Sequence, residues 1–93
     1  MTDCSQHKKD VAGISDMKVL AEMIGDLHYE TLAVFTNHLA NKLSQDGVRD
    51  YENKRKELGA KLMYAAGYCR QLCNSIQEVW RISKPFMNKN ENK

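Results

Sequence analysis

Residues 51–83 read YENKRKELGAKLMYAAGYCRQLCNSIQEVWRIS, the most regular stretch of the chain. Ten positions within it follow one another at alternating steps of four and three residues, which is the spacing of a helix that packs along one seam. They are Tyr51, Arg55, Leu58, Leu62, Ala65, Cys69, Leu72, Ile76, Val79 and Ser83. A β-strand would repeat every two residues, so this stretch predicts a long helix.

Local signals bound this helix on both sides. Asp50 lies just before the pattern and can accept a hydrogen bond from a free backbone N–H, which is the role of an N-cap residue. Pro85 lies just after it and disfavours helical geometry in Lys84, the residue that precedes the proline. We therefore expect a helix over residues 49–84.

A helix of similar length is expected earlier in the chain, over residues 15–46. Ser15 or Asp16 can cap its start, and Gly47 suits a left-handed stop. Its predicted packing side consists of Met17, Leu20, Ile24, Leu27, Thr31, Phe35, Leu39 and Leu43. The linker of residues 44–50 is short, and a short linker makes two helices antiparallel neighbours.

The expected architecture is all-α, a long antiparallel two-helix hairpin in one domain. The chain has 93 residues, which suits one small domain with much of its surface exposed. The hairpin domain is expected over residues 14–86. Residues 1–13 and 87–93 are polar and show no periodicity, so they are expected to be mobile tails.

The apolar surface is wider than one hairpin can cover, which predicts a homo-oligomer with a four-helix or larger arrangement. Apolar residues of the first helix spread over roughly 200° of its circumference, about twice what one partner helix needs. In the second helix, a row of small residues that ends in tryptophan runs beside the seam. The predicted oligomer interface is Met23, Val34, Gly59, Ala66, Cys73 and Trp80. The alternative is a monomer whose N-terminal tail and a turn near residues 11–14 cover one flank.

Three glycines lie inside the expected helices, and each destabilises a helix by about 1 kcal/mol relative to alanine. They are Gly25, Gly59 and Gly67. Close approach of two helix backbones is the usual compensation, because a glycine has no Cβ atom in the way. We therefore expect a neighbouring helix to pass near these positions.

Composition argues against several function classes. The formal net charge of +2 is too small to indicate a nucleic-acid-binding protein, and no apolar run is long enough to span a bilayer. Cys4, Cys69 and Cys73 are an odd number of thiols, which favours a reducing cytoplasm. No catalytic motif and no metal-ligand spacing is visible, so we expect a non-enzymatic protein without a metal or another cofactor.

A binding function is the class that remains, and the first candidate ligand is an anionic nucleotide. Basic residues gather at the expected hairpin tip, where they can pair with phosphate, while tyrosines of the second helix can stack on a base. The predicted ligand-binding residues are Arg49, Lys54, Arg55, Tyr64, Tyr68, Arg70 and Arg81. The two tyrosines project roughly opposite to the last two arginines, so one joint site would have to form between subunits.

The segment Tyr51-Glu52-x-x-Arg55 resembles the start of the helical hairpin in small phage proteins that sequester cyclic-nucleotide immune signals as oligomers. The resemblance covers five residues. In that family a proline-containing turn soon breaks the helix, whereas the pattern here continues to Ser83. The resemblance implies a compact, oligomeric, non-enzymatic inhibitor or sponge that acts against host defence, and no site residues are transferred from it.

The sequence thus predicts a binding protein that sequesters or inhibits its target, with an anionic nucleotide-type ligand first. An adaptor or inhibitor that binds a host protein through an apolar groove is the alternative. A small DNA-binding regulator is a second alternative, and Glu52 and Glu57 disfavour it because carboxylates among the basic residues repel phosphate.

Overall fold

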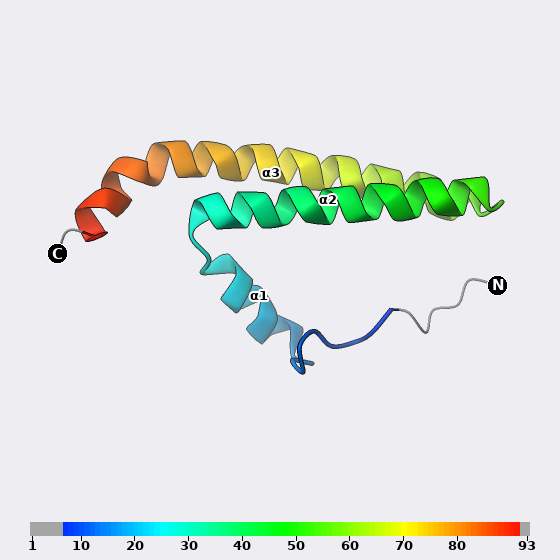
Figure 1. Cartoon of the computed structure of the whole chain (residues 1–93), viewed down its shortest axis with the longest axis horizontal. Coiled ribbons are helices and arrows are strands. Elements are labelled where there is room, and N and C mark those ends of the chain that lie inside the picture. Colours follow the sequence, from blue (N-terminus) through cyan, green and yellow to red (C-terminus); the bar gives the residue numbers. More distant parts are fainter. Residues whose placement is uncertain (1–6, 92–93) are drawn as a thin grey trace.

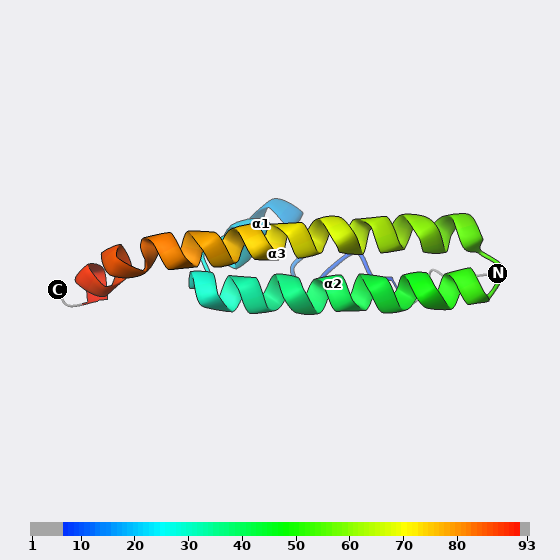
Figure 2. The same ribbon diagram turned by 90° about the horizontal axis from the view of Figure 1, so that it is seen from above.

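The computed structural model describes residues 7–91, with side chains described as far as Phe86. The described residues form three helices, α1 (Met17–Gly25), α2 (Tyr29–Glu52) and α3 (Lys56–Glu91). α2 and α3 lie side by side and antiparallel, and α1 leaves the open end of this hairpin at an angle (Figure 1, Figure 2). The all-α prediction is confirmed, and the long hairpin consists of α2 and α3.

The prediction of a single helix over residues 15–46 is wrong, because residues 26–28 are not helical and separate α1 from α2. Asp16 caps α1 as expected, since its Oδ1 accepts the Lys18 N–H at 3.0 Å. At His28 the backbone is extended, and the imidazole Nδ1 accepts the Glu30 N–H at 3.2 Å. His28 therefore acts as the N-cap of α2 by satisfying one of its free backbone donors.

The hairpin turn directly follows α2, and the predicted linker at residues 44–50 is helical. Lys54 has a φ of 70°, so a lysine supplies the left-handed residue that was expected at Gly47. Arg55 then holds the turn together, because both its backbone N–H and its side chain bond to Asp50. The prediction failed here because the turn is stabilised by this contact and needs no glycine.

α3 continues past the residue that was predicted to end it. The expected helix covered residues 49–84, but α3 starts after the turn and runs through Pro85 to Glu91. Proline removes one backbone hydrogen bond and usually bends a helix, and the last turns of α3 curve away from its main axis (Figure 1). The backbone of residues 87–91, predicted as part of a mobile tail, is therefore helical.

The predicted N-terminal tail contains one tight turn. Val11 and Ile14 exchange two backbone hydrogen bonds of 3.0 and 2.8 Å, and Ala12 and Gly13 between them have positive φ angles. Val11 is 52% exposed. It is therefore not buried against the hairpin, as it would be if this turn covered one side of a monomer. Residues 1–6 of this tail lie outside the described residues.

Small residues form the seam between α2 and α3. The seam positions on α2 are Ala33, Thr36, Ala40, Gly47 and Asp50, and those on α3 are Gly59, Ala66, Cys69, Cys73 and Ile76. The thiol of Cys69 donates to the Thr36 carbonyl at 3.2 Å, and the thiol of Cys73 to the Ala33 carbonyl at 3.3 Å. Contacts this short between a cysteine and the opposite backbone show how closely the two helices approach.

The α3 seam is rotated relative to the predicted one. Leu58, Leu72 and Val79 were expected inside, yet their side chains are 44, 52 and 42% exposed. The neighbouring row of small residues, which includes Gly59 and Ala66, faces α2 instead. The sequence pattern identified both rows correctly, but the smaller side chains face inward because they allow the two backbones to come closer.

The closest approach lies at Gly47 and Gly59. A Cβ atom on Gly59 would lie 2.5 Å from the carbonyl oxygen of Gly47 and 2.6 Å from the backbone nitrogen of Tyr51. A Cβ atom on Gly25 or Gly67 would meet nothing within 4 Å, so the expected close approach occurs at only one of the three glycines. Because the seam consists of small residues, no large side chain within the described part of the chain is fully buried.

Candidate functional site

The hairpin is a single layer of two helices and therefore has two faces (Figure 2). One of these two faces is polar, as contacts between the two helices show. Arg70 Nη1 donates to Asn41 Oδ1 at 3.0 Å, and Asn37 and Gln77 line a common groove. We call this side, which also carries Val34, the polar face.

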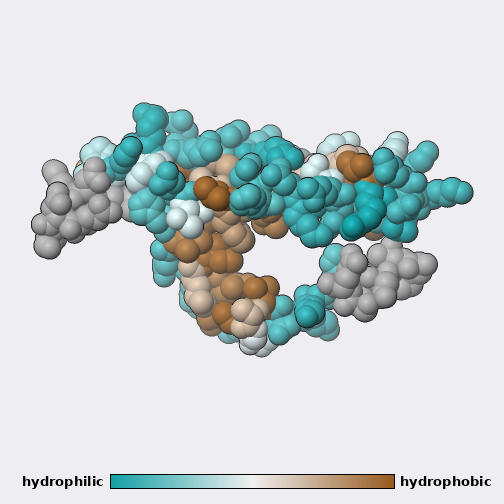
Figure 3. All heavy atoms as spheres, in the orientation of Figure 1, coloured by the Kyte–Doolittle hydropathy of each residue, from teal (hydrophilic) through white to brown (hydrophobic). Residues whose placement is uncertain are grey.

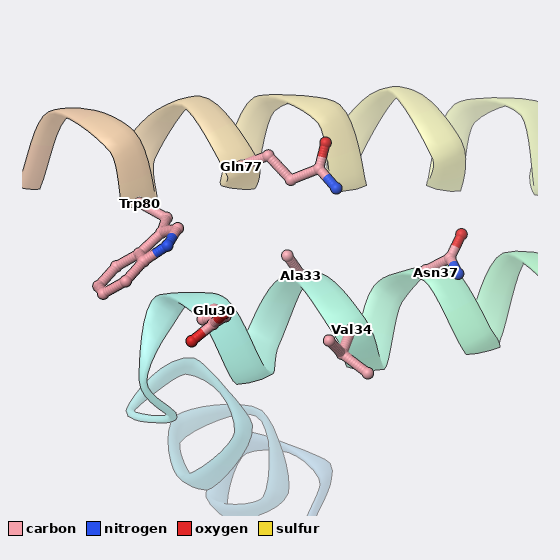
Figure 4. Close-up of a pocket in the computed structure, with 6 residues that line it drawn as sticks. All are labelled: Glu30, Ala33, Val34, Asn37, Gln77 and Trp80. Carbon is pink, nitrogen blue, oxygen red and sulfur yellow. The ribbon is translucent and has the colours of Figure 1, made fainter. Parts of the chain in front are cut away.

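The groove on the polar face has a volume of about 400 Å³ (Figure 4). It is lined by Glu30, Ala33, Val34, Asn37, Gln77 and Trp80. Trp80 points from α3 toward α2, Gln77 extends along α3, and Asn37 points from α2 toward α3. Two amides and an indole can bind a planar polar group, but the Glu30 carboxylate repels an anion.

The opposite side of the hairpin is apolar. At 3.6 residues per turn, Phe35 and Leu39 project away from the polar face on α2, and Leu72 and Val79 do so on α3. With Leu58 they form the apolar face, whose members are between 39 and 52% exposed. Farther round α3 lies an outer edge of exposed side chains, namely Tyr64, Tyr68 and Ile82.

The predicted basic tip is formed, but its arginines already have carboxylate partners. Arg49 Nη2 lies 2.8 Å from Asp46 Oδ1, and Arg55 donates to Asp50 Oδ1 through Nε at 2.9 Å and Nη2 at 2.7 Å. The Asp50 side chain is only 11% exposed, so its ion pair with Arg55 is shielded from water and helps to hold the turn. Lys54 is exposed between them and is free to meet solvent.

The Asp46 carboxylate has a second cation beside it. Lys42 Nζ donates to Asp46 Oδ1 at 2.8 Å, and this hydrogen bond lowers the pKa of Asp46. Burial opposes the shift, while the positive charges of Lys42, Arg49 and His7 add to it. The local field at the tip is thus partly cancelled within the hairpin itself.

The remaining predicted ligand residues lie elsewhere on α3. Tyr64 and Tyr68 are 63 and 71% exposed at the outer edge, whereas Arg70 is on the polar face. Arg81 donates to Glu78 Oε1 at 2.7 Å, and this hydrogen bond raises the pKa of Arg81. The tyrosines and these arginines project to different sides of α3, so no site within one chain brings all of them together.

Part of the predicted oligomer interface is wrong. The row assigned to a second subunit on α3 was Gly59, Ala66, Cys73 and Trp80. The first three are buried against α2, and Trp80 is half-buried with its ring centroid 4.5 Å from that of His28. Met23 and Val34 are 54 and 52% exposed and remain accessible for contacts between subunits.

The histidines and cysteines of the helices have structural surroundings. His28 caps α2 and packs on Trp80, whereas His38 is exposed. Cys69 and Cys73 are free thiols buried in the seam. Over residues 7–86, no three side chains of the usual metal-binding types lie close enough together to hold an ion.

Comparisons with protein-family models, with curated proteins and with solved structures gave no match to the chain. Within the described residues, none of the helices combines the length and apolar character that crossing a membrane requires.

Proposed function

We propose that the protein is a non-enzymatic interaction module that associates with itself, and with helices of target proteins, through the apolar face. The observation that supports this most is a large apolar surface on a single layer of helices. A stable domain normally packs at least two layers around its core, and here the buried residues are mainly small. A second layer supplied by another molecule would complete the core.

The spacing of the exposed residues suits a helical partner. Leu58, Leu72 and Val79 belong to one row with Ala65 and Phe86, in which a residue recurs every seventh position. Rows of this kind pack against the side of another helix in coiled coils and helix bundles. The row extends along nearly the whole of α3, so it offers an elongated surface rather than a pocket for a small molecule.

The geometry favours this function over nucleotide sequestration. A phosphate at the tip would compete with Asp46 and Asp50 for the arginines, and the acid-lined groove on the polar face does not favour anions. Nucleotide binding stays a prediction that a thermal-shift panel of cyclic nucleotides checks. Binding would raise the melting temperature of the protein.

The test compares two substitutions on the same helix. Leu72→Glu places a charge in the apolar face, and Asn74→Glu places the same charge on an exposed position of α3 outside that face. Both sites are exposed, so both variants should fold. We expect sedimentation velocity to show fewer subunits for Leu72→Glu than for the wild type, with Asn74→Glu unchanged. Equal association of all three proteins would refute the proposal.

A further inference from the structure

Within the described residues, α1 is a well-formed helix that packs little against the other helices. It has 9 residues, and isolated helices shorter than about 12–15 residues are only marginally stable in water. None of its residues is buried, and Met17, Val19 and Met23 are 48, 43 and 54% exposed. It makes almost no contact with the hairpin. The described part of the chain therefore leaves much of its apolar side exposed.

The connection between α1 and α2 holds α1 away from its own hairpin. The backbone N–H groups of Asp26 and Leu27 bond back into the last turn of α1 at 3.0 and 3.1 Å. His28 then caps α2 and stacks on Trp80. Only three residues join the helices, so α1 cannot swing far without breaking these contacts. Figure 3 shows apolar side chains gathered on α1 and on the adjoining part of the molecule.

Building on the proposed self-association, we infer that α1 is an exchange arm, that is, a segment that packs on a second copy of the chain instead of on its own hairpin. α1 of one copy packs its apolar side on the apolar face of a second copy, and the second copy returns the same contact. A two-fold axis makes the two contacts identical and closes the assembly as a dimer. Two unpartnered apolar surfaces of one chain, α1 and the apolar face, thereby cover each other.

The available area reaches the lower limit for such a dimer. The apolar face and the exposed side of α1 together carry side chains that are about half exposed, such as Phe35, Leu72 and Met23. At about 100–200 Å² for a whole side chain, they expose on the order of 500 Å² in each copy. Two copies would bury about 1,000 Å², which is the lower limit for a specific interface.

The test mixes two defective variants of the full chain. Met23→Glu damages the arm and Leu72→Glu damages the face. Ala21→Glu is the control, because it puts the same charge at an exposed position of α1 that lies farther than Met23 from the middle of the apolar side. Each defective variant alone loses both contacts of its dimer. In a mixed pair, the intact arm of the face variant meets the intact face of the arm variant, so one contact is restored.

Native mass spectrometry, with an affinity tag on one variant to separate the masses, reports the outcome. We expect Ala21→Glu to be dimeric, each defective variant to lose at least tenfold in dimer affinity, and the mixture to form more mixed dimer than either homodimer. No excess of mixed dimer would overturn exchange. A dimeric Met23→Glu beside a monomeric Leu72→Glu would refute only the arm. A monomeric wild type would refute the self-association on which it rests.

Discussion

The substitution Gly59→Ala, which adds one methyl group, should destabilise the hairpin by about 2 kcal/mol. The new Cβ atom would lie 2.5 Å from the Gly47 carbonyl oxygen, and 2.6 and 2.9 Å from the backbone nitrogen and Cα of Tyr51. These are backbone atoms that cannot rotate away, so the clash belongs at the upper end of the about 1–3 kcal/mol typical of overpacking. Alanine has a better helix propensity than glycine, which offsets about 1 kcal/mol of this destabilisation.

Gly67→Ala is the matched control on the same helix. Its Cβ atom would meet nothing within 4 Å, so only the helix propensity changes and stability should rise by about 0.5–1 kcal/mol. Urea and thermal unfolding, followed by circular dichroism at one protein concentration, measure both variants. We expect the melting temperature to fall by roughly 10 °C for Gly59→Ala and to rise by a few degrees for Gly67→Ala. If Gly59→Ala were as stable as Gly67→Ala, the close approach of α2 and α3 would be incorrect.

Three further predictions concern side-chain contacts. Asp46→Asn should lower stability at neutral pH by less than about 1 kcal/mol, because its partners are exposed. The lowered pKa means that this contribution is lost as the pH falls through and below 3.8, so unfolding at low pH should not distinguish the two proteins. Arg55→Met should cost about 1–2 kcal/mol in urea unfolding by leaving the Asp50 carboxylate unpaired, and Arg55→Lys should restore only part. His28→Ala should lose about 1 kcal/mol of capping that His28→Asn retains, while both change the fluorescence of Trp80.

Local signals predicted the parts of the fold that depend on local chemistry. The steps of four and three residues indicated the long helix α3, and a short linker, although placed too early in the chain, indicated the antiparallel pairing. Asp16 caps α1 as its side chain suggested. The breaks were missed where an unusual residue takes a standard role. His28 serves as an N-cap and Lys54 as the left-handed residue of the turn. Neither residue type is a common choice there, so the sequence alone gave no signal.

Periodicity located the residues of the candidate site but not their role. Phe35, Leu39, Leu58, Leu72 and Val79 were all predicted to pack inside the hairpin, and all form its exposed apolar face. Periodicity shows which residues share one side of a helix. It does not show which of two neighbouring apolar rows meets the partner helix, because that depends on how closely two backbones can approach. Here the row of small residues lies between the two helices, and the larger side chains remain exposed on the apolar face.

The number of subunits in the freshly purified wild-type protein, measured by native mass spectrometry, tests the proposed role of the apolar face most directly. We expect a dimer, or a larger assembly with an even number of subunits. A monomer that remains monomeric as the protein concentration is raised would contradict it.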